Sequence, residues 1–293
     1  MVPATLFLLA HQDDEFGVFF EIEKTLANGG RVICVYLTDG AARVPTSQRN
    51  EESVAILKEL GVPNEDVHFL GAALEVPDGH LVEHLERAYR AIEAQLPDLG
   101  KIDRVVVHAW EGGHQDHDAA HLVGVALARS LECLEASRQF ASYRAALGLS
   151  RLFVVGWPLA ANGLIESTRI PFTTRLRYLR YCFYYKTQRM TFMGLLPLMI
   201  VDYVLSGAQK LQPLDKSRVS ERPHRGKLLY ETRSNFSFDL FRLMAMEFVG
   251  ARIRPLTPGK AHYAGTAQRV PGSQLPGIRT RSWRAAFEDL RPL

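Results

Sequence analysis

The first 155 residues alternate between short continuous apolar runs and longer segments with helical periodicity. A continuous apolar run bounded by turn residues is typical of a strand buried on both faces, whereas apolar positions every three or four residues indicate a helix. We predict strands at residues 4–10, 31–38, 66–71, 104–110 and 151–157. We predict helices over residues 16–28, 46–60, 80–96 (stopped by Pro97) and 114–136.

Strands that alternate with helices build a parallel sheet covered on both faces. The predicted fold class is therefore α/β: a Rossmann-like three-layer sandwich with a mostly parallel sheet, plus an irregular C-terminal part. In open sheets of this kind, ligands bind beyond the carboxyl ends of the strands. The segments "HQDDE" and "GGHQDH" each follow a predicted strand directly, so both are expected at the same edge of the sheet.

The alternation is lost after about residue 158. We therefore predict a Rossmann-like core over residues 1–157. Residues 158–293 would form a C-terminal region beside the substrate cleft, completing the same domain with a strand near 226–231. The apolar stretch 190–201 contains Pro197 and is too short for a membrane span. The tail from Pro255 is rich in Pro, Gly and Arg and is expected to be loosely ordered.

Composition is that of a soluble globular protein, with 47% hydrophobic and 23% charged residues in 293. The three cysteines form no CxxC pair, which argues against a disulfide framework or a thiolate zinc site and favours a reducing cytoplasm. The apolar N-terminus lacks a basic region and a small-residue cleavage site, so we interpret it as a strand and not a signal peptide.

Charge is divided unevenly along the chain. Residues 1–150 carry 12 Lys and Arg against 23 Asp and Glu, and residues 151–293 carry 23 against 9. An acidic half can host a cation, and a basic half can receive an anionic ligand or surface. The two halves could also simply dock on each other.

Two histidine- and aspartate-rich segments provide candidate metal ligands. In "HQDDE", His11 and Asp14 are close enough to converge on one ion, while Asp13 can point past it. In "GGHQDHDAAH", the glycines allow close backbone approach, and His114 and His117 share one face of the first helical turn. Two imidazoles and one carboxylate around an open position are typical of catalytic zinc. The same set also suits iron(II).

These residue types admit other interpretations. Taken alone, the aspartates of "HQDDE" could be a helix N-cap cluster. His121, four residues after His117, could compete as a ligand, although we expect it to support the site from behind or to be exposed. Asp116 and Asp118 would also favour a helix N-terminus electrostatically.

The motifs "AHQDDE" (10–15) and "HQDH" (114–117) resemble the two signatures of the PIG-L/LmbE-like family of zinc-dependent de-N-acetylases. The namesake of the family is N-acetylglucosaminyl-phosphatidylinositol de-N-acetylase. Further similar segments are "LTDG" (37–40), "QRNEES" (48–53), "LGVPNEDVHFLG" (60–71), "PDG" (77–79) and "GKLLYE" (226–231). Gln12 and Gln115 replace prolines of the family pattern, which would loosen the turn before each ligand.

The resemblance implies a role for each matching residue. One zinc ion would be bound by His11, Asp14 and His117. Asp13 would be the general base, His114 would stabilise the oxyanion and could act as acid, and Asp116 would orient a histidine. Arg49 and Asp78 match positions that contact the sugar in the family, although Arg49 could equally form an ion pair on a helix surface.

The implied function is that of a metal-dependent amide hydrolase, acting on C–N bonds other than peptide bonds. It would remove an N-acetyl group from an N-acetylglucosamine-containing glycan, glycolipid or conjugate. A non-catalytic sugar-binding protein of the same fold is the alternative. A nucleic-acid partner is not expected, because no recognition motif is present and the first half is acidic. The aglycone and the oligomeric state stay open.

The segment 175–189 mixes arginines with tyrosines. These side chains could meet phosphates and sugar faces. With the apolar stretch that follows, they could instead seat a cytoplasmic protein peripherally on an anionic membrane. Alternatively, the aromatic rings pack against the sheet while the arginines extend outward.

Overall fold

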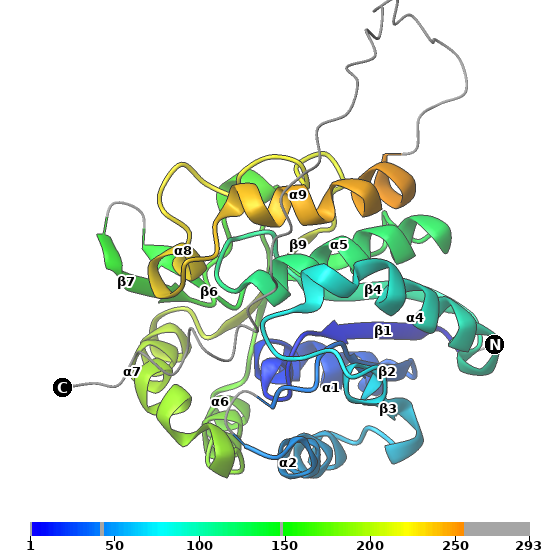
Figure 1. The fold of residues 1–293 in the computed structure, drawn as a ribbon. Helices are drawn as coiled ribbons and strands as arrows, with labels where there is room; N and C mark the ends of the chain where they lie inside the picture. The colour runs from blue at the N-terminus through cyan, green and yellow to red at the C-terminus, as the bar shows by residue number, and fades with distance from the viewer. Residues whose placement is uncertain (1, 42–43, 147–148, 255–293) are drawn as a thin grey trace, which may run out of the picture. The chain divides into compact units, whose positions relative to one another are not determined.

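The computed structural model describes residues 2–41, 44–146 and 149–254 (Figure 1). These residues belong to one compact unit that spans residues 1–256, so residues 158–254 are part of the same unit as the predicted core. The expectation for the tail from Pro255 lies outside the described residues.

A seven-stranded sheet in the order β3-β2-β1-β4-β5-β9-β8 forms the centre of the fold. The first five strands are parallel, β9 is antiparallel to β5, and β8 is antiparallel to β9. In chain order, the strands are β1 (Ala4–Leu9), β2 (Arg31–Tyr36), β3 (Val67–His68), β4 (Ile102–His108), β5 (Arg138–Phe140), β8 (Glu166–Arg169) and β9 (Ala208–Pro213). The predicted α/β class with a mostly parallel sheet is confirmed.

Helices cover both faces of this sheet (Figure 1). One face packs on α4 (Leu85–Leu99), α5 (Gln115–Ser130) and α9 (Phe238–Phe248). The other packs on α1 (Phe19–Ala27), α2 (Thr46–Glu59), α6 (Phe172–Tyr181) and α7 (Arg189–Leu205). Successive β1 residues enter opposite cores: Leu6 joins the first and Phe7 the second. Burial on both faces explains why this strand is a continuous apolar run.

Short helices complete the described chain. They are η1 (Asp14–Val18), η2 (Asn64–Asp66), α3 (Leu70–Ala73), η3 (Leu81–His84), η4 (Ala160–Asn162), η5 (Lys186–Gln188), α8 (Leu229–Arg233) and the π-helical η6 (Val249–Ile253). Throughout residues 2–41, 44–146 and 149–254, the structure contains no helix with the length and apolar character needed to traverse a bilayer.

Two sequence-based assignments were wrong, and a third predicted a real strand but placed it in the wrong sheet. Residues 226–231 are not a strand, because they lead into helix α8, where the Glu231 carboxylate accepts the Leu228 N–H at 2.9 Å and caps the helix start. The strand predicted at 151–157 is β7 (Leu149–Val155), which pairs with β6 (Tyr143–Ala146) in a separate antiparallel ribbon. Helix α4 continues two residues past Pro97 and ends before Gly100, whose φ is +81°.

Candidate active site

The candidate site lies where the order of strands along the sheet reverses. From β1 the chain moves outward to β2 and β3, and then returns to place β4 on the other side of β1. Parallel sheets of this type bind ligands at such a switch point, beyond the carboxyl ends of the strands. His11 follows β1 after one intervening residue, and His108 is the last residue of β4.

Two glycines allow the loop after β4 to enter the site. Gly112 has a φ of +71°, and a Cβ at Gly113 would stand 1.8 Å from the Tyr143 carbonyl oxygen. Only glycine fits such an approach without moving the backbone. The loop delivers His114 as the N-cap of α5, where its Nδ1 accepts the Asp116 N–H at 3.2 Å.

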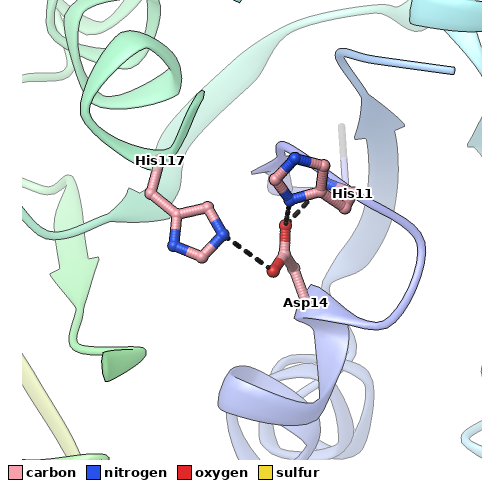
Figure 2. Close-up of side chains that lie close together, drawn as sticks. All are labelled: His11, Asp14 and His117. Carbon is pink, nitrogen blue, oxygen red and sulfur yellow. Dashed lines mark hydrogen bonds and ion pairs between the residues drawn. The ribbon is translucent and has the colours of Figure 1, made fainter. Parts of the chain in front are cut away.

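The two predicted motifs meet at three side chains, His11, Asp14 and His117 (Figure 2). Asp14 Oδ1 lies 3.1 Å from His117 Nε2, and Asp14 Oδ2 lies 3.4 Å from His11 Nδ1. Figure 2 shows the Asp14 carboxylate between the two imidazole rings. One ligand atom from each residue lies within 4.8 Å of the others.

The chemistry of these atoms fits a divalent cation. His117 is buried, and neither ring nitrogen makes a hydrogen bond within the described residues, because Nε2 approaches Asp14 Oδ1 without hydrogen-bond geometry. Burial lowers the pKa of His117 to about 4, which keeps the imidazole in the neutral form that binds metals. Burial alone would raise the pKa of Asp14, but His117 and His108 outweigh it and hold that pKa well below its ordinary value. A charged carboxylate thus faces a neutral, unpartnered imidazole.

Asp116 fixes the orientation of His11. The Asp116 carboxylate accepts the N–H groups of Gly79 at 2.6 Å and Leu81 at 2.9 Å, and it lies 3.1 Å from His11 Nε2. Burial lowers the pKa of His11, but Asp78, Asp116 and Asp14 reverse this effect and raise it well above its ordinary value. A proton on Nε2, held by Asp116, leaves Nδ1 directed at Asp14, which is the arrangement of metal-binding histidines supported by a carboxylate.

A second set, His11, His114 and Asp116, also has ligand atoms close enough to hold an ion. Its atoms have other uses, because His114 Nδ1 caps α5 and both Asp116 oxygens accept backbone N–H groups. The set of His11, Asp14 and His117 is therefore the better candidate.

Asp13 occupies a strained backbone position beside these residues. Its φ of +121° is rare for a residue with a side chain and is typical of functional sites. Its N–H donates to Glu15 Oε2 at 3.0 Å, and its Oδ1 lies 3.3 Å from the Arg49 guanidinium. Burial raises the pKa of Asp13 to about 8, against the opposing charge of Arg49. Asp13 makes no side-chain cap to η1, so the N-cap interpretation of the cluster was wrong.

Arg49 is buried and does not form the surface ion pair that was considered for it. Its guanidinium donates to the carbonyl oxygens of Gly40 and Gln12 and lies 3.8 Å from Asp78 Oδ2. Burial alone would raise the pKa of Asp78, but His11 outweighs it and lowers that pKa strongly. Arg49 and Asp78 thus present a cation and an anion beside Asp13.

The glutamines that replace the family prolines make tethers of their own. Gln12 Nε2 donates to Asn50 Oδ1 at 2.7 Å, which ties the turn after β1 to helix α2. Gln115 Nε2 donates to the Gly79 carbonyl at 3.4 Å and links the start of α5 to the loop held by Asp116. Hydrogen bonds therefore restrain both turns where proline would have restrained φ.

His108 is a site residue that the sequence analysis missed. Its Nε2 lies 3.1 Å from Asp14 Oδ2, and its Nδ1 lies 2.9 Å from Ser142 Oγ. His121 Nδ1 donates to the His108 carbonyl at 2.8 Å, so His121 supports the site from behind the ligands, as expected. The available signal was a histidine at the end of an apolar strand that precedes a candidate metal-binding motif.

A cavity of about 520 Å³ opens beside these residues. Its polar lining includes His11, Asp13, Asp14, Arg49, Asp78 and His114. Its wall also includes apolar side chains of Phe16, Ile170, Phe192, Met199 and Tyr203. The cavity is thus lined both by residues predicted to act in catalysis, metal binding and sugar contact and by residues of the C-terminal region.

Residues 6–128 match the family model described as PIG-L, GlcNAc-PI de-N-acetylase. Among solved structures, a deacetylase triple mutant of the teicoplanin biosynthetic pathway is similar, with 17% identity and a TM-score of 0.54 over 72% of this chain and 97% of that one. The A40926 pseudoaglycone deacetylase shares 16% identity, with a TM-score of 0.53 over 71% and 96% of the two chains. A conserved protein from Thermus thermophilus shares 15% identity, with a TM-score of 0.50 over 73% and 93%.

No curated protein sequence matches the chain. At these identities, the three structures establish a shared fold.

Proposed function

The chain carries a PIG-L-family domain over residues 6–128, and from this premise we propose that it is a metal-dependent de-N-acetylase. The substrate would be an N-acetylated amino sugar, with N-acetylglucosamine linked to a lipid, glycan or other carrier as the first candidate. The observation that carries the proposal is the convergence of His11, Asp14 and His117, with Asp13 beside them and not among them. Zn²⁺ is the first candidate ion, one per chain, and Fe²⁺ the second.

An ion held by His11, Asp14 and His117 would supply Lewis acidity toward water and the amide carbonyl. Asp13 would accept the proton of the attacking water at its carboxylate. Burial makes Asp13 a stronger base than an exposed aspartate, and the positive charge of the bound ion would keep it in the carboxylate form that can accept this proton. The Arg49 guanidinium, 3.3 Å from Asp13 Oδ1, also favours the charged carboxylate of Asp13.

His114 would stabilise the negative charge that develops on the amide oxygen. Burial lowers the pKa of His114 to about 4, so the ring is neutral near pH 7. Its Nδ1 accepts the Asp116 N–H, which places the ring proton on Nε2. A neutral imidazole with this tautomer donates a hydrogen bond into the cavity, as an oxyanion-stabilising group must.

Asp78 and Arg49 would bind sugar hydroxyl groups. Both line the cavity, and together they offer an acceptor and a donor beside Asp13. A hydroxyl group can donate to the Asp78 carboxylate and accept from the Arg49 guanidinium, which orients the ring relative to the base.

Amine release from a panel of N-acetylglucosamine conjugates tests the proposal, with zinc or iron(II) supplied. Wild type should release amine, and Asp13→Asn should lower kcat by about 100-fold or more. Asp118→Asn is the control, because it makes the same substitution at a fully buried aspartate that does not line the cavity. Equal turnover by wild type and Asp13→Asn would refute the assigned base. Binding without release by wild type would favour the sugar-binding alternative.

A further inference from the structure

Helix α7 is apolar around almost its whole circumference. Its 17 residues include two charged side chains, Arg189 at its first position and Asp202 near its end. Asp202 is buried and pairs with Lys210 Nζ at 2.5 Å. A helix without a polar face is expected in a protein core or in contact with lipid.

One side of α7 faces the interior. Phe192 and Met199 are buried and belong to the core beneath the sheet, and the Phe192 ring stacks on Tyr185 with centroids 4.9 Å apart. Phe192, Met199 and Tyr203 also line the cavity of the candidate active site. The residues on this side of the helix therefore pack in the core or line the cavity.

The rest of α7 is uncovered in the described part of the chain. Met193, Pro197, Ile200 and Val204 follow helical spacing along one stripe, and each is exposed, with Met193 and Val204 both at 67%. Further exposed apolar residues of the helix are Met190, Leu198, Val201 and Leu205. An apolar area this continuous marks an interaction surface.

Helix α6 packs beside α7 (Figure 1), where Arg175 donates to the Tyr203 carbonyl at 2.8 Å. The tyrosines of α6, Tyr178 and Tyr181, are buried against the sheet, as in the packing interpretation of this segment. Exposed apolar residues nonetheless continue onto this helix and its end: Phe172, Leu176 and Phe183. We call the exposed apolar residues of both helices the α6–α7 face.

Positive charge accompanies the α6–α7 face. Residues 166–210 contain seven Lys and Arg against two Asp and Glu. Both acidic residues are paired, Glu166 with Arg138 and Asp202 with Lys210. The exposed basic residues include Arg169, Arg180, Lys186 and Arg189. The segment that carries this face therefore combines exposed apolar side chains with exposed basic ones.

We propose that the α6–α7 face docks on an anionic lipid bilayer, with α7 lying in the interface and not crossing it. A 17-residue helix is roughly 25 Å long, shorter than a bilayer crossing needs. Basic residues beside an apolar face match anionic headgroups above acyl chains. Because α7 also lines the active-site cavity, docking would place the cavity wall at the lipid surface. The inference concerns binding alone and does not depend on the catalytic proposal.

Co-sedimentation with vesicles tests this inference. Wild type should bind vesicles of phosphatidylcholine and phosphatidylserine at least about tenfold more strongly than phosphatidylcholine alone, and added salt should weaken the binding. Met193→Glu/Val204→Glu should lose at least about tenfold in affinity, because it places two charges in the apolar stripe. Leu243→Glu/Met246→Glu on α9 is the matched control, with side chains 65% and 64% exposed, and should bind as wild type does.

Failure of wild type to bind anionic vesicles would overturn the inference, as would an equal loss in both double variants. Light scattering tests whether a second copy of the chain covers the α6–α7 face instead, because it measures the oligomeric state. A dimer that Met193→Glu/Val204→Glu disperses, without vesicle binding by wild type, would assign the face to a second copy of the chain. Asp13→Asn should bind vesicles normally, so loss of turnover and loss of docking are separable.

Discussion

Replacing Asp116 by asparagine should cost both stability and metal affinity. The Asp116 carboxylate is fully buried and accepts the N–H groups of Gly79 and Leu81 on different oxygens, with His11 Nε2 as a third neighbour at 3.1 Å. An asparagine has one oxygen, so its amide group must face one of the two N–H donors. A buried donor without a partner costs about 1–3 kcal/mol. Loss of the charge beside His11 adds to this, for a total of about 2–4 kcal/mol.

Asp118→Asn provides the control for this prediction. Asp118 lies on the same helix and is also fully buried, but burial raises its pKa to about 8. Its side chain is therefore largely protonated at pH 7, and an asparagine amide can replace the acid's O–H. We expect less than about 1 kcal/mol of destabilisation at pH 7.

Urea unfolding at pH 7 measures the free energy of unfolding of both variants, and competition with a zinc chelator measures metal affinity. Asp116→Asn should bind zinc about 10–100-fold more weakly, because the carboxylate that orients His11 is lost. Similar destabilisation of the two variants, or unchanged zinc affinity in Asp116→Asn, would refute the reasoning from charge state and hydrogen bonding.

Three further perturbations follow from the structure. Burial raises the pKa of Glu111 from its ordinary 4.5 to about 7. Between these pH values the native state holds a proton that the unfolded state has lost. The free energy of unfolding should therefore fall as pH rises from 4.5 to 7, by at most about 3 kcal/mol. Glu111→Gln should flatten that slope in urea unfolding followed across pH, and an unchanged slope would contradict the assignment. Gly113→Ala should lower the free energy of unfolding by about 1–3 kcal/mol, because the added Cβ would meet the Tyr143 carbonyl oxygen. Gly194→Ala is the control and should be neutral or stabilising, because nothing lies within 4 Å of its added Cβ. Thermal unfolding of both variants distinguishes the two outcomes. Arg49→Lys keeps the positive charge, but a lysine cannot reach both the Gly40 and Gln12 carbonyl oxygens. In steady-state kinetics, KM should rise about tenfold or more. An unchanged KM would exclude a sugar-binding role for Arg49.

The parts of the fold that could be predicted are those with a local signal. β1 is buried on both faces, so its residues are apolar apart from Thr5, and the polar cluster after it marks the sheet edge. The convergence of His11 and His117 followed from the rule that parallel strands end at a common edge. The strand predicted near 226–231 was wrong because "GKLLYE" contains a strand-like apolar pair. The Glu231 contacts that accompany the helix involve Phe238 and Arg222, which lie just outside this segment.

The supporting contacts of the site could not be predicted, because they join distant segments. Asp116 accepts the N–H groups of Gly79 and Leu81, which are 37 and 35 residues away. No local sequence pattern predicts such a contact. His108 is the last residue of an apolar strand, and the sequence alone did not distinguish it from an ordinary polar residue at a strand end. The burial of Arg49 likewise depends on Gly40 and Gln12 closing over its guanidinium group.

The zinc content of three proteins tests the central claim most directly. Wild type, His117→Ala and Asp13→Asn would be loaded with zinc, dialysed and measured by elemental analysis. We predict one ion per chain in wild type and in Asp13→Asn, and close to none in His117→Ala, because His117 would be a ligand of the ion and Asp13 would not. Wild-type zinc content in His117→Ala, or loss of zinc in Asp13→Asn, would contradict the assignment of the metal centre.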